Sequence, residues 1–416
     1  MKATATILKA VPALFAIQGL QYLIPLLTIP FLVRVLGLDG WGQVALLITF
    51  GQLVLILLDY GLHLSATQAA ARSTGDSNAL AALFGAVTMA KLIVAAAALP
   101  LILLAAGLIE HVDDNPPLLA WALAAVLIQA HDPLWYFLAT NQAHRIAVLT
   151  VTSRMAAVII MLITIRTPDD AWIYFASQLA AWLAVVCAGI WYARRQTGFA
   201  WRHLRGGIAV LRDGSRIFQL YAGSSSFDYL VPLALGAVTD PTSVGLFVGA
   251  EKLARAAASL LTPFRNALFP QMSRLLAEVQ TEARLLLRWA LVRMGGLAAA
   301  ASLTLLLAAD PLVPLLLGEA ARPAVPILHI LSLLPLLLTL NGLIGVQWMI
   351  PAGRASALRN IYIATGMLRL LLCVLLAGML DAPGAALAVI SSELSVLGAC
   401  LLYLRWWPIR ESRPSD

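Results

Sequence analysis

Eight ionisable side chains lie deep inside long apolar stretches of this 416-residue chain. They are Lys91, Arg154, Asp228, Glu251, Lys252, Arg255, Arg369 and Glu393. A charged side chain near the centre of a bilayer costs about 2.5–3.5 kcal/mol on insertion scales. Eight such residues facing lipid would cost on the order of 20–28 kcal/mol, which exceeds the usual net stability of a protein. We therefore expect them to face the protein interior, to pair, or to extend toward the membrane surface.

Cations outnumber acids among these residues, which indicates a water-filled cavity that attracts an anionic substrate such as a phosphate or uronate. The candidate anion-binding residues are Lys91, Arg154, Lys252, Arg255 and Arg369. Ion pairing is the alternative for some of them. Glu251 and Arg255 are four residues apart on one predicted helix, a spacing that permits a pair, and Glu393 can pair with Arg369 across helices. Lys252 can also extend outward along its apolar stem.

The three acids Asp228, Glu251 and Glu393 are the candidates for binding a coupling ion, either H⁺ or Na⁺. Asp228 is preferred because it lies between the polar run 223–226 and Pro232, where an interrupted helix exposes backbone oxygens. Four further residues are candidate gates or helix breaks because they are prolines within spans or charges near span ends. They are Pro25, Arg34, Asp59 and Pro232.

The elements that carry these residues are apolar stretches long enough to cross a bilayer. Hydrophobic residues make up 61% of the chain and charged residues only 12%, whereas soluble domains have roughly 25% charged residues. About 20 apolar residues form one spanning helix. We predict twelve spans, at 11–33, 43–63, 79–108, 118–138, 146–165, 172–193, 217–238, 244–268, 287–309, 325–349, 357–379 and 384–405.

The distribution of Lys and Arg predicts the orientation of these spans. Most basic residues fall in alternate connecting segments, which include the termini and the long polar stretch 194–216, whereas the intervening loops carry mainly acids. The positive-inside rule therefore places both termini in the cytoplasm. We predict an N-terminal six-helix lobe at 1–193, a basic cytoplasmic linker at 194–216, a C-terminal six-helix lobe at 217–405 and a cytoplasmic tail at 406–416. Two roles are open for the linker: it is a membrane anchor alone, or it also binds lipid headgroups or a partner protein.

A short repeat relates the two predicted lobes. Span 1 contains Tyr22-Leu-Ile-Pro25-Leu, and the seventh span contains Tyr229-Leu-Val-Pro232-Leu. Six spans per repeat is an even number, so the lobes are expected to have the same orientation and to be related by a pseudo-two-fold axis along the membrane normal. Paired proline interruptions point to a central cavity between the lobes. The predicted fold class is thus an all-α membrane protein.

Several other classes of protein are disfavoured by motifs that the sequence lacks. It has no GxxxxGK[ST] phosphate-binding loop, no GxSxG and no HExxH motif. Its three cysteines have no metal-ligand or disulfide spacing. The net charge of +7 follows membrane topology rather than a surface for nucleic acid. We therefore expect no enzyme activity, no cofactor and no nucleic-acid partner.

Four stretches together resemble the polysaccharide transporter (O-antigen flippase type) family of the multidrug/oligosaccharidyl-lipid/polysaccharide exporter superfamily. They are 25–42, with its Pro25, Pro30, Arg34, Gly37 and Gly42; 59–62 (Asp-Tyr-Gly-Leu); 244–270, from Val-Gly-Leu-Phe to Phe-Pro; and 350–393, with Pro-Ala-Gly-Arg at 351–354, Gly-Ala-Ala-Leu-Ala at 384–388 and Glu393. The order and spacing of these stretches over nearly the whole chain carry the resemblance, because each stretch alone is degenerate.

The resemblance implies two six-helix lobes around a V-shaped cavity and export of an undecaprenyl-pyrophosphate-linked oligosaccharide across the bacterial inner membrane. It also implies ion-coupled alternating access, with cavity cations contacting the anionic groups of the substrate. By placement, Arg154, Arg255 and Arg369 are the candidates for that contact. Membrane lipids and other polysaccharide-assembly membrane proteins are the further partners expected.

Three other functions remain open on the sequence. A cation-coupled drug or metabolite exporter of the same fold would favour a more aromatic and acidic cavity. A membrane glycan polymerase or ligase would need a larger outer loop for its acceptor. An assembly or scaffold subunit would leave the intramembrane charges without a role.

Overall fold

The computed structural model describes residues 2–73, 75–198 and 206–407, and every regular element within these ranges is a helix. The chain divides into two compact units, Met1–Ala237 and Val238–Asp416. We describe each unit by itself. The all-α fold class predicted from the sequence is confirmed.

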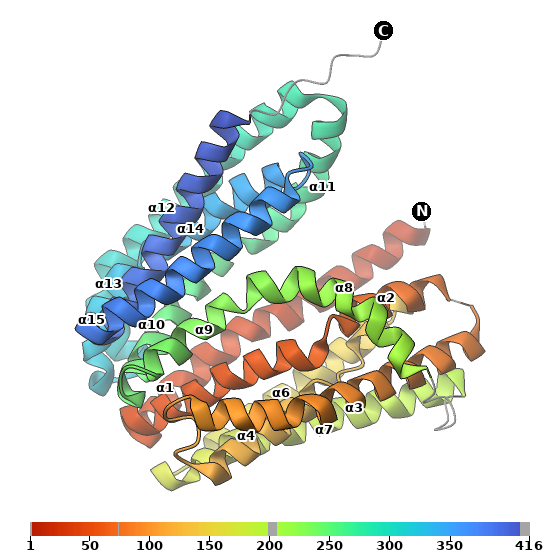
Figure 1. The fold of residues 1–416 in the computed structure, drawn as a ribbon, viewed down its shortest axis with the longest axis horizontal. Helices are drawn as coiled ribbons and strands as arrows, with labels where there is room; N and C mark the ends of the chain where they lie inside the picture. The colour runs from red at the N-terminus through yellow and green to blue at the C-terminus, as the bar shows by residue number, and fades with distance from the viewer. Residues whose placement is uncertain (1, 74, 199–205, 408–416) are drawn as a thin grey trace. The chain divides into compact units, whose positions relative to one another are not determined.

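The first unit consists of nine α-helices and one short 3-10 helix in its described part (Figure 1). Its helices are α1 (Lys2–Asp59), α2 (Leu62–Arg72), α3 (Ser77–Leu108), α4 (Pro116–Gln129), α5 (Leu134–Ala139), α6 (Ala143–Thr164), η1 (Pro168–Asp170), α7 (Ala171–Thr197), α8 (Gly207–Ser225) and α9 (Phe227–Gly236). α7 packs against α4 and α6, and α1 packs against α6, α4 and α9. α8 packs against α2 and α3.

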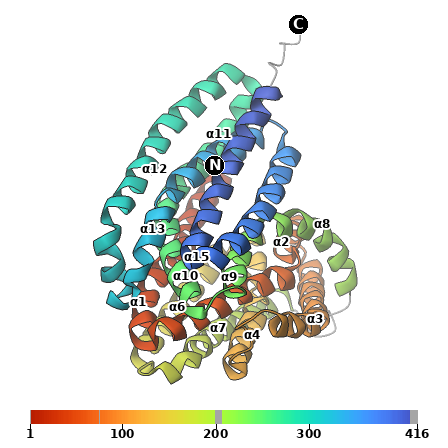
Figure 2. The same cartoon turned by 60° about the vertical axis from the view of Figure 1, so that its left-hand side comes forward.

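The second unit is also helical throughout its described part (Figure 2). Its helices are α10 (Pro241–Ser259), α11 (Thr262–Glu278), α12 (Gln280–Leu317), η3 (Glu319–Ala324), α13 (Val325–Leu331), α14 (Leu334–Asn341), the π-helix η4 (Gly342–Met349) and α15 (Ala355–Trp406). α14 packs against α10, α12 and α15, so it lies near the middle of this unit.

The two longest helices each contain a sharp break. α1 has 58 residues, and an unbroken helix of that length would measure about 87 Å, far more than the roughly 30 Å of bilayer hydrocarbon. Gly37 interrupts α1 with a φ of 75°, and Asp381 interrupts α15 with a φ of 52°. After the second break the chain folds back tightly, since a Cβ built on Gly384 would lie 2.2 Å from the oxygen of Leu376. Each of these helices therefore supplies two spans.

Each predicted span is mostly helical, and several, such as 43–63 and 118–138, are interrupted by short turns. In the described part of the chain, eight helical stretches are long and apolar enough to cross a membrane. Two of them, Leu27–Arg72 and Ala355–Trp406, each extend across one of the breaks. The spans predicted at 217–238 and 244–268 correspond to the helix pairs α8–α9 and α10–α11. These pairs are shorter or more polar, since α10 carries Glu251, Lys252 and Arg255.

The predicted linker 194–216 is helical at both ends. α7 continues to Thr197 and ends at Gly198, which has a φ of 69°, and α8 begins at Gly207. Residues 199–205 of this linker and 408–416 of the predicted tail lie outside the described residues. α8 and α9 contact α1, α2 and α3, so the compact units divide after α9. The six-plus-six division at 194–216 stays a prediction.

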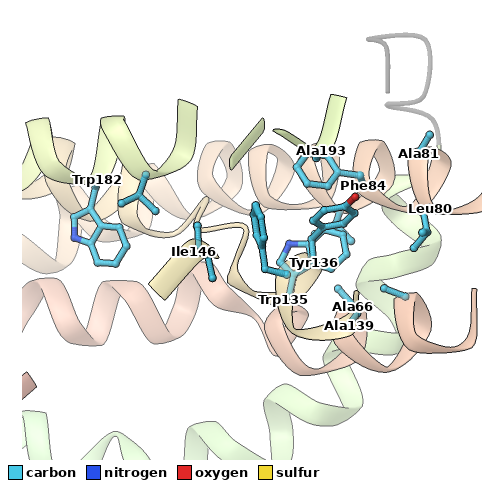
Figure 3. Packing of buried hydrophobic residues seen from close by; sticks show 14 residues of the cluster. Ala66, Leu80, Ala81, Phe84, Trp135, Tyr136, Ala139, Ile146, Trp182 and Ala193 are labelled. Carbon is cyan, nitrogen blue, oxygen red and sulfur yellow. The ribbon is translucent and has the colours of Figure 1, made fainter. Parts of the chain in front are cut away.

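An aromatic cluster forms the core at one end of the first unit. Trp135, Tyr136 and Phe137 on the short helix α5 pack with Phe84 on α3, as Figure 3 shows for Trp135, Tyr136 and Phe84. The ring centroids of Phe84 and Tyr136 are 5.5 Å apart in an edge-to-face arrangement, a favourable geometry for aromatic pairs. This cluster fixes the position of α5 between α2, α3 and α6.

Candidate functional site

The first group of intramembrane charges surrounds Lys91, halfway along α3. The side chain is buried, with 4% of its residue surface exposed. Its Nζ donates to the backbone oxygen of Ala130 at 2.6 Å and to that of Asp132 at 3.4 Å. Asp59 and Asp132 interact electrostatically with the Lys91 ammonium. Lys91 therefore has partners from two other parts of the first unit, the segment between α4 and α5 and the end of α1.

Arg154 on α6 belongs to the same unit and contacts mainly aromatic side chains. Its guanidinium carbon lies 5.3 Å from the centroid of the Trp182 ring on α7, within the range of a cation–π interaction. It also interacts electrostatically with Tyr174 and Asp132. Its Nε is buried and has no hydrogen-bond acceptor among the described residues. A buried donor without an acceptor is costly, so this position favours an incoming anionic or carbonyl group.

The second group of charges is a fully buried network in the second unit. The Arg369 guanidinium pairs with the Glu393 carboxylate through Nη2, and its Nε donates to the Ser392 hydroxyl at 3.1 Å. The Nδ2 of Asn341 donates to Oε2 of Glu393 at 2.7 Å. The Ser392 hydroxyl in turn donates to the Thr365 backbone oxygen. Pairing of Glu393 with Arg369 across helices is confirmed.

The pair predicted on α10 is also present. Arg255 Nε lies 2.8 Å from Oε1 of Glu251, one helical turn earlier. The Arg255 side chain retains 23% exposure, whereas that of Glu251 retains 8%. Lys252 follows Glu251 on the same helix and is half-buried. Of the three candidate anion-binding cations in this unit, Arg255 and Arg369 form ion pairs with carboxylates.

The candidate gates occupy ordinary helical positions. α1 continues through Pro25, and α9 continues through Pro232. The sequence predicted these prolines as gates or helix breaks, and neither interrupts its helix. A proline removes only one hydrogen bond, and its φ is compatible with a helix. The seventh span is interrupted instead at Ser226, and Asp228 lies in the first turn after this break. Arg34 is exposed three residues before the Gly37 break.

Asp59 ends α1 beside a second non-helical turn. Tyr60 and Gly61 both have positive φ, 48° and 70°, and α2 begins at Leu62. Asp59 interacts electrostatically with Lys91 and with His63 on α2. The structure therefore brings Asp59 together with Lys91, whereas the sequence showed no partner for Lys91.

The candidate residues form separate groups. Lys91, Arg154 and Asp59 share the first unit, and Glu251, Lys252, Arg255, Arg369 and Glu393 share the second. Sequence reasoning missed Asn341 and Ser392 as partners of the Arg369–Glu393 pair. It also missed Trp182 beside Arg154. The described residues contain no cluster of His, Cys, Asp and Glu that could hold a metal ion.

Comparison with known proteins places the chain in a family. Residues 7–276 match the family model described as polysaccharide biosynthesis protein. A curated relative from Escherichia coli (strain K12), named "Putative O-antigen transporter", is 28% identical over 395 residues, which are 94% of this chain and 95% of the relative.

Two solved structures share the fold. The lipid II flippase MurJ in an inward closed conformation gives a TM-score of 0.71 at 10% identity, covering 95% of this chain and 87% of MurJ. A multidrug resistance MATE family transporter of the MOP superfamily, in an inward-facing conformation, gives 0.65 at 14% identity, covering 92% of this chain and 96% of the transporter. Because the family model covers more than half of the sequence, this chain belongs to the polysaccharide biosynthesis protein family and has the fold of MOP superfamily transporters.

Proposed function

We propose that this membrane protein is a flippase that moves an undecaprenyl-pyrophosphate-linked oligosaccharide across the bacterial inner membrane. The observation that carries the proposal is Arg154, a largely buried intramembrane cation whose Nε has no acceptor in the part of the chain that the structure describes. The family and the names of its relatives support a lipid-linked glycan as the substrate. The predicted cytoplasmic location of both termini belongs to this proposal.

A lipid-linked glycan presents a specific physical problem. Its polar head cannot enter hydrocarbon without losing hydration, whereas its lipid tail can remain in the bilayer. A cationic, water-accessible path between helices would shelter the pyrophosphate while the tail stays in lipid. The protein then needs to move the head and has no bond to make or break. This is why we assign transport rather than catalysis.

The pairing of charges narrows the choice of anion-binding residue. Arg369 and Arg255 already pair with Glu393 and Glu251, and these carboxylates offset the positive charge that would attract an incoming anion. Lys91 donates to backbone oxygens. Arg154 lies over the face of Trp182, a contact that leaves N–H donors available for a phosphate. Arg154 is therefore the first candidate for contact with the substrate.

Ion-coupled alternating access is the mechanism we propose. Asp228 lies two residues after the break between α8 and α9 at Ser226, and an interrupted helix is where secondary transporters commonly bind coupling ions. We therefore retain Asp228 as the candidate for H⁺ or Na⁺ binding.

Transport in proteoliposomes tests the function directly. The purified protein should move a fluorescent undecaprenyl-pyrophosphate oligosaccharide between leaflets faster than liposomes without protein. The same preparation should not accumulate a cationic dye, which a drug exporter of this fold would transport. Dye transport without movement of the lipid-linked glycan would overturn the proposal and favour the exporter. Glycosidic bond formation by the same preparation would favour the polymerase.

A further inference from the structure

The fourth predicted span is broken in its interior. α4 ends at Gln129 and α5 begins at Leu134, and Pro133 lies between them without an amide hydrogen. The amides of His131 and Asp132 bond only three residues back, to Ile128 and Gln129. The helical hydrogen-bond pattern is therefore lost for about one turn.

Two backbone oxygens at this break, those of Ala130 and Asp132, receive hydrogen bonds from outside the span. In a continuous helix the amide of Leu134 would donate to the oxygen of Ala130. Here the Leu134 amide donates to Oδ1 of Asp132 at 3.0 Å, as at the start of a new helix. The oxygen of Ala130 instead accepts from Nζ of Lys91 at 2.6 Å. The lysine replaces the donor that the break removes.

Further contacts hold the residues between α4 and α5 in place, and we call this segment, 130–133, the joint. Gly189 on α7 allows close approach, since a Cβ there would lie 2.3 Å from Cγ of Pro133. Asp59, at the end of α1, and Asp132 balance the Lys91 charge. Two neighbouring helices, α3 through Lys91 and α7 through Gly189, thus contact the same four-residue segment, and Trp135 and Tyr136 follow it closely in the aromatic core.

We propose that Lys91 is a positioning residue that fixes the joint between α4 and α5, and that it is not a substrate contact. Its ammonium supplies the hydrogen bond that Ala130 loses, so α5 keeps its angle to α4 while the charge remains buried. The consequence for transport rests on the proposed function. Lys91 should affect the rate of movement through its hold on α5 and leave the affinity for the anionic head unchanged.

Lys91→Met tests the joint because methionine has a similar length and no donor. In substrate-free protein, amide hydrogen exchange of peptides covering 130–139 should become roughly tenfold faster, since a buried acceptor is left unsatisfied. In proteoliposomes, turnover of the lipid-linked glycan should fall by a similar factor with an unchanged half-saturating concentration. A severalfold rise in that concentration with unchanged exchange would make Lys91 a substrate contact and overturn the inference.

Two partner substitutions separate hydrogen bonding from charge balance. Both Asp132→Ala and Asp132→Asn remove the charge opposite Lys91. Only Asp132→Ala also removes the acceptor of the Leu134 amide, which can then donate to Ala130. Lys91→Met/Asp132→Ala should therefore recover near wild-type exchange, and Lys91→Met/Asp132→Asn should not. Equal recovery by both would show that Lys91 acts through its charge alone and would refute the joint.

The comparison of the two double variants still tests the inference if Lys91→Met alone fails to fold. In that case the Ala double variant should reach the membrane and the Asn double variant should not, and the opposite order contradicts the inference. Hydrogen exchange needs no substrate. A wild-type protein that moves no lipid-linked glycan would therefore refute the proposed function, whereas the exchange results would still decide the role of Lys91.

Discussion

Arg369 and Glu393 form a buried ion pair between the two halves of α15, on opposite sides of the Asp381 break. Asn341, at the end of α14, completes the hydrogen bonding of the carboxylate. The pair is neutral as a unit and joins three predicted spans. It therefore fits a structural role better than the anion-binding role that the cation surplus suggested for Arg369.

Removing one partner of this pair should destabilise the protein. Arg369→Ala leaves the Glu393 carboxylate buried without its counter-charge, and breaking a buried pair in this way typically costs about 3–5 kcal/mol. We expect a lower yield in membranes and a lower unfolding temperature in detergent. The double variant Arg369→Met/Glu393→Gln should recover much of the loss. Normal stability with lost transport in Arg369→Ala would instead make Arg369 a substrate contact.

Arg154 should show the opposite pattern. Arg154→Ala removes a donor that has no acceptor within 2–73, 75–198 and 206–407, and a cation–π contact worth about 0.5–2 kcal/mol, so the protein should still fold. Transport of the lipid-linked glycan should fall at least tenfold, and Arg154→Lys should recover part of it because the charge is kept. Surface glycan in cells and protein level in membranes are measured together. Full transport by Arg154→Ala would exclude the cation from substrate binding.

Asp228 is expected to couple transport to an ion gradient. Asp228→Asn should abolish the stimulation of transport by a proton or sodium gradient and leave slow equilibration intact, because the amide cannot be protonated or hold the same charge. Proteoliposomes with and without each gradient provide the measurement. Glu393→Gln is a poor control because it breaks the pair with Arg369, so Glu278→Gln, an exposed surface acid, serves instead. Wild-type transport that is independent of both gradients would end the coupling hypothesis.

The close contact between α7 and Pro133 predicts that Gly189 cannot carry a side chain. Gly189→Ala forces a methyl group against a rigid proline ring and should destabilise the first unit by about 1–3 kcal/mol. Gly107→Ala on α3 is the matched control, since nothing lies within 4 Å of a Cβ there. The control should be neutral or slightly stabilising. Thermal unfolding of both variants checks the difference, and equal unfolding temperatures would argue against the tight packing.

The predicted topology can be tested with single cysteines in a variant lacking Cys187, Cys373 and Cys400. Cysteines at the exposed positions Asp113 and Asp169 should react with a membrane-impermeant maleimide in intact cells. A cysteine at Arg195, which is also exposed, should react only after the cells are opened, since the positive-inside rule places it in the cytoplasm. Labelling of Arg195 from outside would invert the orientation.

The helices could be predicted from the sequence because apolar length alone specifies them. Twenty-residue apolar runs leave the backbone no partner except itself, so the spans are mostly helical in the structure. The Glu251–Arg255 pair could also be predicted, because a four-residue spacing places both side chains on one face of a helix. These features depend on local sequence.

The partners of Lys91 and Arg154 could not be predicted from local sequence. Lys91 bonds to backbone oxygens about 40 residues away, and a backbone oxygen has no side-chain signature. The one sequence signal of the break between α4 and α5 was Pro133, whose nitrogen carries no hydrogen. This break leaves the backbone oxygen of Ala130 without its helical donor. Trp182 beside Arg154 depends on the register of α6 against α7, which an apolar pattern does not determine. The same limit applies to the π-helix before Met349.

The break at Asp381 has a mechanical consequence. It leaves one non-helical residue between two membrane-length helices, and Gly384 packs directly on the backbone of Leu376. Away from this bend, the Ser392 hydroxyl donates to the Thr365 backbone oxygen and Arg369 pairs with Glu393, so the two helices are joined along their length as well as at the turn. We therefore expect the last two spans to move as one body when the protein changes conformation.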